Sequence, residues 1–407
     1  MRPNRRTLGM IAVLAGYGLA IGMAYGAGKY GPGASDTEIK IGHTNPYSGP
    51  ASSYGTIGRA IEGYFKKINA EGGINGRKIT FITYDDGYSP PKTVEQVRRL
   101  VEQDQVLLLF NTLGTPTNTA IWKYVNDRRV PHLLVATGAT KWGDPQGHPW
   151  TMGWQPNYQS EGQVYAKYIL QHLPQAKIAI LYQNDDYGKD YLKGFKDGLG
   201  GQAKTRIIAE QSYEVTDPTV ESQIINLKNS GADVFFNITI PKFAAQAIRK
   251  AADIGWQPTH LLNSVSASVE AVLKPAGFAA SKGVITAFSL KDPDDPQWQN
   301  DPAVKEWRAW MAQYYAEGNV HDLFNVYGYS AAQTLVHVLK KCDDDLTREN
   351  VMRQAANIQD LELSMLLPGI KINTSPTDFY PIEQMQLARF DGEKWVLFGE
   401  IIEAAVR

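Results

Sequence analysis

The residues that could do chemistry in this 407-residue chain are acidic pairs, scattered histidines and one serine motif. Asp85-Asp86 and Asp185-Asp186 each follow an apolar run and could act as acid–base pairs. Turn formation explains both pairs better, because Asp side chains accept hydrogen bonds from nearby backbone N–H groups. GYSAA at 328–332 lacks the second glycine of a nucleophile elbow. No motif pairs a nucleophile with a base, so we expect no catalytic residues and no enzyme activity.

Metal chemistry is not indicated either. The histidines show no H-E-x-x-H spacing, and we interpret them as capped or solvated: His43, His132, His148, His172, His260, His321 and His337. DPDDPQ at 292–297 lacks the glycine of a calcium loop and predicts a solvated turn. CDDDLTREN predicts a helix start capped by Asp345 or Thr347. Cys342 is the only cysteine, so no intrachain disulfide forms, and we expect a buried thiol. The sequence thus predicts no metal and no cofactor.

The stretch HTNPYSGPASSYGTIGRAIEGYF at 43–65 joins an apolar run to a helical pattern through a turn rich in Gly, Ser and Pro. Such a turn can present N–H groups to an anion. This stretch holds neither a Walker loop nor G-x-G-x-x-G, only spaced single glycines, which argues against a nucleotide at this turn. The net charge of −1 leaves no basic excess for nucleic acid. The remaining candidates are a substrate in an active site and the carboxylate of a small ligand that is only carried.

The N-terminus has the layout of a secretory signal. Arg2, Arg5 and Arg6 precede an apolar run over 8–27 that closes on small residues. We predict a signal peptide over 1–27, a linker over 28–37 and a periplasmic protein; the alternative is an uncleaved anchor helix. The Arg5-Arg6 pair suggests a twin-arginine route, but the flanking residues do not complete that motif.

Short apolar runs alternate with amphipathic stretches through the rest of the chain. The sequence predicts strands at Ile39–Gly42, Ile79–Tyr84, Val106–Phe110, Leu133–Ala136, Ile178–Tyr182, Ile207–Glu210, Val234–Ile238 and Ile285–Phe288. It predicts helices at Ile57–Asn69, Thr93–Glu102, Thr117–Asn126, Gly162–His172, Tyr191–Leu199, Val220–Asn229 and Phe243–Ile254. This alternation is typical of an α/β protein with parallel sheets. A repeated order of helix, Gly-Gly turn, strand, proline and helix at 62–97 and 192–224 predicts two similar lobes. Ligands of such sheets bind beyond the carboxyl ends of the strands.

Seven motifs in order carry a family resemblance: IKIGHTNPYSGPASSYG, GGINGRKITFITYDDGYSPPKTVEQVRRLVEQD, LGTPTNTAI, VPHLLVATGAT, KIAILYQNDDYGKDYLKGF, LKNSGADVFF and AFSL. The chain resembles the branched-chain-amino-acid-type solute-binding proteins of bacterial ABC transporters from about Glu38 to the last strand. The resemblance implies a type I periplasmic-binding fold, with two Rossmann-like lobes joined by three crossover strands around a ligand cleft. The N-terminal lobe would hold 38–156 and 289–385, and the C-terminal lobe 157–288 and 386–407.

The resemblance also implies ligand contacts. Tyr54 would cover the ligand, and two loops would grip its carboxylate: Leu113, Gly114 and Thr115, with Gly138, Ala139 and Thr140. Tyr187 and Phe324 match aromatic residues of the family pocket. Amino-acid binders pair the ammonium group with acidic side chains, but the matching positions here lie near Tyr158 and Val265. Thr239 stands where an aromatic residue is usual. Because a buried ammonium without a counter-charge is costly, these departures favour an acid without an α-amino group.

The sequence therefore predicts a monomeric periplasmic receptor that captures a small organic acid with an aromatic or hydrophobic body and delivers it to an ABC permease. One alternative keeps the fold but binds branched-chain or other hydrophobic amino acids. A second is a ligand-sensing module, and a third is an exported α/β hydrolase.

Overall fold

The computed structural model describes residues 28–403, in which the apolar runs form two separate sheets. The first sheet has five parallel strands in the order β3-β2-β4-β5-β6. Its strands are β2 (Glu38–Asn45), β3 (Lys78–Asp85), β4 (Leu108–Phe110), β5 (His132–Val135) and β6 (Thr151–Gly153). Every residue of β4 and β5 is buried, as expected for central strands of a parallel sheet covered on both faces.

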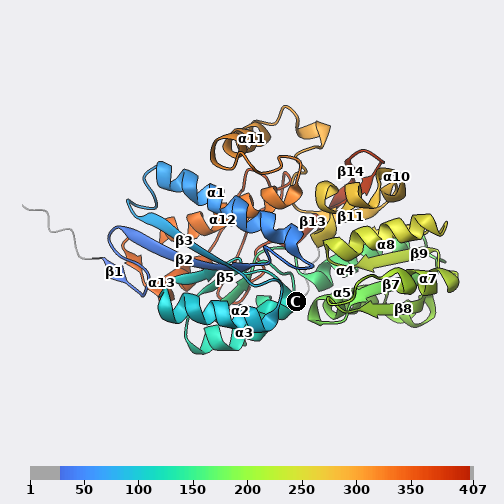
Figure 1. The fold of residues 1–407 in the computed structure, drawn as a ribbon, viewed down its shortest axis with the longest axis horizontal. Coiled ribbons are helices and arrows are strands. Elements are labelled where there is room, and N and C mark those ends of the chain that lie inside the picture. The colour runs from blue at the N-terminus through green and yellow to red at the C-terminus, as the bar shows by residue number, and fades with distance from the viewer. Residues whose placement is uncertain (1–27, 404–407) are drawn as a thin grey trace, which may run out of the picture.

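Six helices belong to this first lobe: α1 (Gly55–Ala70), α2 (Pro90–Arg98), α3 (Thr115–Asp127), α11 (Pro302–Tyr314), α12 (Leu323–Lys341) and α13 (Arg348–Ala355). Ile57, Ile61, Phe65 and Ile68 form a buried face of α1, spaced as a helix requires. Helix α1 packs against α12, so segments from the two ends of the chain share one core (Figure 1). A short pair of strands, β1 (Lys29–Tyr30) and β12 (Asp345–Leu346), joins the start of the described chain to this lobe.

The second sheet has seven strands in the order β14-β13-β11-β10-β9-β7-β8. They are β7 (Ile178–Gln183), β8 (Ile207–Tyr213), β9 (Val234–Ile238), β10 (Thr259–Leu262), β11 (Ile285–Phe288), β13 (Gln384–Phe390) and β14 (Trp395–Glu403). Strands β7 to β11 are parallel, whereas β13 and β14 form an antiparallel edge. The helices of this lobe are α4 (Tyr158–His172), α5 (Asp186–Leu199), α6 (Ala203–Arg206), α7 (Glu221–Asn229), α8 (Pro241–Asp253), α9 (Lys274–Ala276) and α10 (Phe278–Ser281).

The two lobes lie side by side, with the blue, cyan and orange elements in one and the green and yellow elements in the other (Figure 1). The chain enters the second lobe between β6 and α4 and returns to the first after β11. It crosses again before β13, which pairs with β11. The predicted α/β class and the repeated order of elements are confirmed, since α1, β3 and α2 are matched by α5, β8 and α7. Within residues 28–403, no helix is both long and apolar enough to cross a bilayer. The predicted signal peptide lies outside the described residues.

The acidic pairs serve turns, as predicted. Asp85 accepts hydrogen bonds from the backbone N–H groups of Tyr47, Ser48 and Gly87. Asp185 caps α5 by accepting from the N–H groups of Tyr187 and Gly188. Thr347 caps α13. Cys342 is buried, and burial raises its pKa to about 12, so the prediction of a buried thiol is confirmed.

Two predictions of solvated polar residues are wrong. Asp292 and Asp295 of DPDDPQ are buried, because their carboxylates turn inward to accept N–H groups of their own turn. Four histidines are buried rather than solvated: His43, His132 and His260 are capped by hydrogen-bond partners, as the alternative prediction had it, whereas both ring nitrogens of His148 lack one among the described residues. Burial lowers the pKa of His132 to about 3, so its ring is neutral, and Thr112 and Asn118 lie within hydrogen-bonding distance of it. No group of three or more His, Cys, Asp or Glu side chains in the described part of the chain is placed to hold a metal ion.

Candidate ligand-binding site

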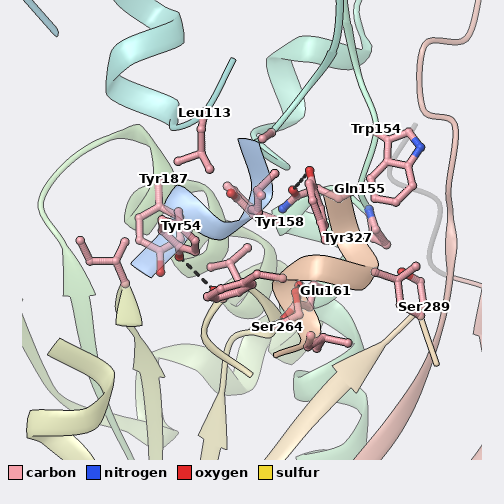
Figure 2. A pocket seen from close by; sticks show the side chains of 18 of the residues that line it. Tyr54, Leu113, Trp154, Gln155, Tyr158, Glu161, Tyr187, Ser264, Ser289 and Tyr327 are labelled. Atoms are coloured by element: carbon pink, nitrogen blue, oxygen red, sulfur yellow. Dashed lines mark hydrogen bonds between the residues drawn. The ribbon is translucent and has the colours of Figure 1, made fainter. Parts of the chain in front are cut away.

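The carboxyl ends of strands from both sheets meet at a cavity with an empty volume of about 900 Å³, part of which is open to solvent. The segments after β2, β3, β4, β5 and β6 contribute from the first lobe, and those after β7, β9, β10 and β11 from the second, together with the start of α4. This is where open parallel sheets place their ligands. Figure 2 shows side chains from both lobes converging on this space.

The wall includes most of the residues that the resemblance implied: Tyr54, Leu113, Gly114, Thr115, Tyr158, Tyr187, Val265 and Phe324. It also includes residues that the sequence did not indicate: Ile57, Tyr88, Ala136, Trp154, Gln155, Pro156, Glu161, Ile240, Ser264, Ala287, Phe288, Ser289, Leu290, Leu323, Tyr327 and Met385. Helical spacing could have indicated two of these residues. Glu161 follows Tyr158 by three positions on α4, and Tyr327 follows Phe324 by three positions on α12, so each pair shares one helix face. Those from 154–156 and 289–290 come from the segments that cross between the lobes, and Met385 comes from the start of β13.

Tyr54 is held at the start of α1 and faces the second lobe. Its backbone carbonyl accepts a hydrogen bond from Asn45 Nδ2 at 2.9 Å. Its ring lies 5.1 Å from that of Phe324, measured between centroids. Its hydroxyl donates to the carbonyl oxygen of Val265 at 2.9 Å, across the cleft (Figure 2). Tyr54 therefore both covers the cavity and links the lobes.

The polar end of the cavity lies at the start of α3. Gly114 precedes the helix with φ at 103°, a conformation that favours glycine. A Cβ at this position would approach the ring of Tyr88 and Thr117 Oγ1 to 2.6 Å. Thr115 opens the helix, and its hydroxyl lies 2.6 Å from that of Thr137. First-turn N–H groups have no partner within a helix, and together with the helix dipole they favour an anion at this end.

The second lobe contributes a stack of tyrosines. Tyr158 lies 4.4 Å from Tyr191 in a stacked arrangement and 5.3 Å from Tyr187 in an edge-to-face one. Asn263 Nδ2 donates to the hydroxyl of Tyr187 at 2.8 Å and fixes that ring. Burial raises the pKa of Tyr158 to about 12, so its hydroxyl keeps its proton at neutral pH. These side chains offer flat apolar surface and a few hydroxyl groups.

The far end of the cavity is bounded by the crossing segments. Trp154 packs edge-to-face on Tyr327 at 4.8 Å, and Tyr327 donates to Gln155 Oε1 at 2.8 Å. Phe288 and Met385 complete an apolar surface there. A ligand long enough to reach this end would contact the segments that must bend when the lobes move.

The structure does not bring every predicted residue into the cavity wall. Gly138 packs under the ring of Tyr158. The backbone N–H of Tyr158 donates to the carbonyl oxygen of Gly138 at 2.7 Å. Thr140 instead contacts the second lobe, where its N–H and its hydroxyl each donate to Asp190 Oδ2 at 2.7 Å. Ala139 lies beside this contact in a separate surface depression. Thr239 is buried, and its hydroxyl donates to Asn237 Oδ1.

Glu161 is an acidic residue of the second lobe that the sequence did not indicate, because the family's acidic positions were matched near Tyr158 and Val265 instead. It lies one helical turn after Tyr158 and lines the cavity. Its carboxyl group contacts Tyr165, Tyr191 and Ser264, all in the second lobe. Among the cavity-lining residues of the described chain, none is Lys, Arg or His, and Glu161 is the only Asp or Glu. The site is thus a largely apolar cavity with neutral donors and one buried carboxyl group.

Two α/β lobes that close on an apolar cavity between their sheets define the class of two-lobed ligand-binding proteins. A profile described as "Periplasmic binding protein" matches residues 38–394, and the chain belongs to this family. A curated relative, the Leu/Ile/Val-binding protein homolog 1 of Brucella abortus (strain 2308), is 26% identical over 330 residues, covering 81% of this chain and 83% of the relative.

Solved structures show the same fold. The chain superimposes with a TM-score of 0.81 on a branched-chain amino acid ABC transporter protein from Thermus thermophilus with bound valine, at 16% identity over 91% of this chain and 97% of that one. It superimposes with a TM-score of 0.78 on a fatty acid ABC transporter substrate-binding protein from Thermomonospora curvata, at 22% identity over 92% of this chain and 95% of that one. The predicted resemblance to branched-chain-amino-acid-type solute-binding proteins and the type I periplasmic-binding fold are confirmed.

Proposed function

We propose that this protein is a periplasmic receptor that binds a small organic acid with an aromatic or other hydrophobic body and delivers it to an ABC permease. The observation that carries the proposal is the pairing of neutral donors at the start of α3 with a tyrosine-rich wall that has no cation among its lining residues in 28–403. The carboxylate would lie against Gly114 and Thr115, and the body between Tyr54, Tyr158 and Phe324. The receptor would work as a monomer without a cofactor, because binding and closure of the lobes suffice for delivery.

A second candidate ligand is a hydrophobic amino acid. Glu161 supplies a carboxyl group in the wall that could face an ammonium group. The fold neighbour from Thermus thermophilus holds valine. Against this, both oxygens of the Glu161 carboxyl group contact groups of the protein itself, namely Tyr165, Tyr191 and Ser264.

Matched pairs of compounds that differ only in the α-ammonium group separate the two candidates. The pairs are 3-phenylpropanoate with L-phenylalanine, and 4-methylpentanoate with L-leucine. A ligand at a hundredfold excess over its Kd stabilises the folded protein by about 2.7 kcal/mol, which a thermal shift detects. We expect the acids to raise the melting temperature and the amino acids to have little effect. A shift with the amino acids alone would contradict the proposal.

A further inference from the structure

The carboxyl group of Glu161 is enclosed by hydrogen-bonding groups of its own lobe. Oε1 lies 2.7 Å from the hydroxyl of Tyr165 and 2.7 Å from the backbone nitrogen of Ser264. Oε2 lies 2.6 Å from the hydroxyl of Tyr191 and 2.7 Å from that of Ser264. Figure 2 shows Glu161 and Ser264 together at the base of the cavity. These contacts tie α4, α5 and the turn after β10 to a single side chain.

The hydroxyl of Tyr165 has one proton and two oxygen neighbours that are placed to receive it. It lies 2.7 Å from Glu161 Oε1 and 2.9 Å from the backbone carbonyl of Leu262. A carbonyl oxygen can only accept, and a phenol donates a single proton. Both short contacts are full hydrogen bonds if Glu161 donates to Tyr165 and Tyr165 donates to Leu262. A protonated Glu161 satisfies this geometry, because its two oxygens can still accept from Ser264 and Tyr191.

The surroundings of Glu161 also disfavour a charge on it. The titratable groups that face it are tyrosines, Tyr158 and Tyr165 on its own helix and Tyr191 on α5. The turn after β10 presents Ser264, and β11 presents Thr286, which lies 3.5 Å from the Tyr165 hydroxyl. Asp190 on α5 turns instead to Gln159 and Thr140. Burial raises the pKa of Glu161, although its hydrogen-bond donors act in the opposite direction.

We propose that Glu161 stands in the cavity wall as a neutral carboxylic acid, and that binding of an organic anion is linked to the proton it carries. The inference rests on the proposed function, since it takes the ligand to be a carboxylate. A ligand carboxylate and an ionised Glu161 would be two like charges in one desolvated cavity, and like charges disfavour each other's ionised form. Glu161 is therefore a specificity-determining residue: it is compatible with an anion only while protonated, and in that state it offers an ammonium group no counter-charge.

The test measures the Kd of 3-phenylpropanoate by isothermal titration calorimetry from pH 5.5 to 8.5, in wild type and in Glu161→Gln. Glutamine keeps the shape of the neutral acid without a titrating proton. For wild type we expect the Kd to rise by up to about tenfold per pH unit above the Glu161 transition. We expect the Kd of Glu161→Gln to be flat with pH over this range, whatever its level, because glutamine has no titrating proton at this position. Repeating wild-type titrations in phosphate and in Tris gives the number of protons taken up, which we expect to approach one per ligand at the high-pH end. This count does not depend on the variant folding.

The outcomes separate this inference from the proposed function. If 3-phenylpropanoate binds wild type with no proton uptake and a Kd that is flat with pH, the inference is overturned and the proposed receptor for organic acids stands. If L-phenylalanine binds wild type in place of the acid, and Glu161→Gln abolishes that binding while its melting temperature is kept, Glu161 is an ionised partner. Both proposals then fail.

Discussion

The hydroxyl of Tyr54 and the backbone carbonyl of Val265 lie 2.9 Å apart, in a hydrogen bond that crosses the cleft between the lobes. Tyr54 follows the first strand of one sheet, and Val265 follows β10 of the other. Because its two groups belong to different lobes, the bond helps to hold the lobes together and stabilises neither lobe alone. The ring of Tyr54 also lines the cavity, so one residue contacts the space for the ligand and links the two lobes.

Replacing Tyr54 by Phe should therefore weaken ligand binding while leaving the lobes folded. The ring keeps its packing on Phe324, but the closed state loses one hydrogen bond worth roughly 0.5–1.5 kcal/mol. We expect the Kd to rise by about three- to tenfold, measured by calorimetry. Tyr64→Phe is the control, since Tyr64 is a buried tyrosine of the same lobe that does not line the cavity. An equal loss of affinity in both variants would contradict a role in closure.

A second contact between the lobes lies outside the cavity, where Thr140 meets Asp190. Asp190 Oδ2 accepts from both the N–H and the hydroxyl of Thr140, and Oδ1 accepts from Gln159 at 2.6 Å. Asp190→Asn should open the cleft, because the amide cannot accept through both of its heavy atoms. Hydrogen bonds to a charged group contribute roughly 1.5–3 kcal/mol each, so we expect at least a tenfold weaker Kd. Small-angle scattering should show a larger radius of gyration without ligand.

Asp186→Asn provides the matched control for this contact. Asp186 also reaches across the cleft, to Lys141 at 2.7 Å, but its side chain is 60% exposed. Exposed ion pairs contribute little because water and salt screen them. We expect a Kd within about twofold of wild type. A larger effect at Asp186 than at Asp190 would show that long-range charge, and not the buried contact, holds the lobes together.

Much of the fold could be predicted because its signals are local. Each predicted strand became a strand, since a run of buried apolar residues between Gly- or Pro-rich turns has few other solutions. The strands β1, β6, β10 and β12 were missed because two to four residues carry too little pattern, and β13 and β14 were not among the predicted strands either. DPDDPQ was misjudged because its composition is that of a surface turn. Its burial depends on packing in a distant part of the chain, where Lys291 reaches Asp301 and the carbonyl of Ser364.

The candidate site was only partly predictable because it is assembled from both lobes. Tyr54, Thr115 and Tyr187 follow strands, so their place at the cleft follows from topology. Thr140 also follows a strand, β5. The loop after β5 turns toward α5, so the donors of Thr140 meet Asp190 and not the cavity. Glu161 could be predicted as a wall residue only if the helix were known to begin at Tyr158, because Glu161 then lies on the same helix face as Tyr158. A predicted helix start at 162 placed both residues in a loop.

The buried turn at 292–297 should make stability depend on pH in a defined direction. Burial raises the pKa of Asp292 from 3.8 to about 7. Between these values the unfolded chain loses the proton while the folded protein keeps it, so the free energy of unfolding falls as pH rises. Asp292→Asn removes this dependence and should raise the melting temperature at pH 8, where the gain is on the order of 1–4 kcal/mol. At pH 4 the two proteins should melt alike.

Asp294→Asn is the control in the same turn. Asp294 lies 3.6 Å from the Arg308 guanidinium, so its carboxylate has a cationic partner in the folded protein. We expect this variant to gain no stability at pH 8. A loss of stability in Asp292→Asn at that pH would mean that the ionised carboxylate has a partner of its own in the folded protein.

Gly114→Ala should damage the polar end of the cavity more than its backbone strain explains. A Cβ at this residue would press on the ring of Tyr88 at 2.6 Å, and Tyr88 and Thr115 would have to move from the wall. Gly277 provides the matched control, because it precedes α10 with φ at 100° and its Cβ would meet nothing closer than 4.0 Å. Alanine at either site requires an unfavourable backbone conformation, with a cost of roughly 1–3 kcal/mol in the free energy of unfolding. We expect Gly114→Ala to lose ligand binding by at least tenfold and Gly277→Ala to keep it, as measured by calorimetry on protein whose folding is checked by thermal melting. Equal affinities in the two variants would show that the start of α3 does not hold the ligand.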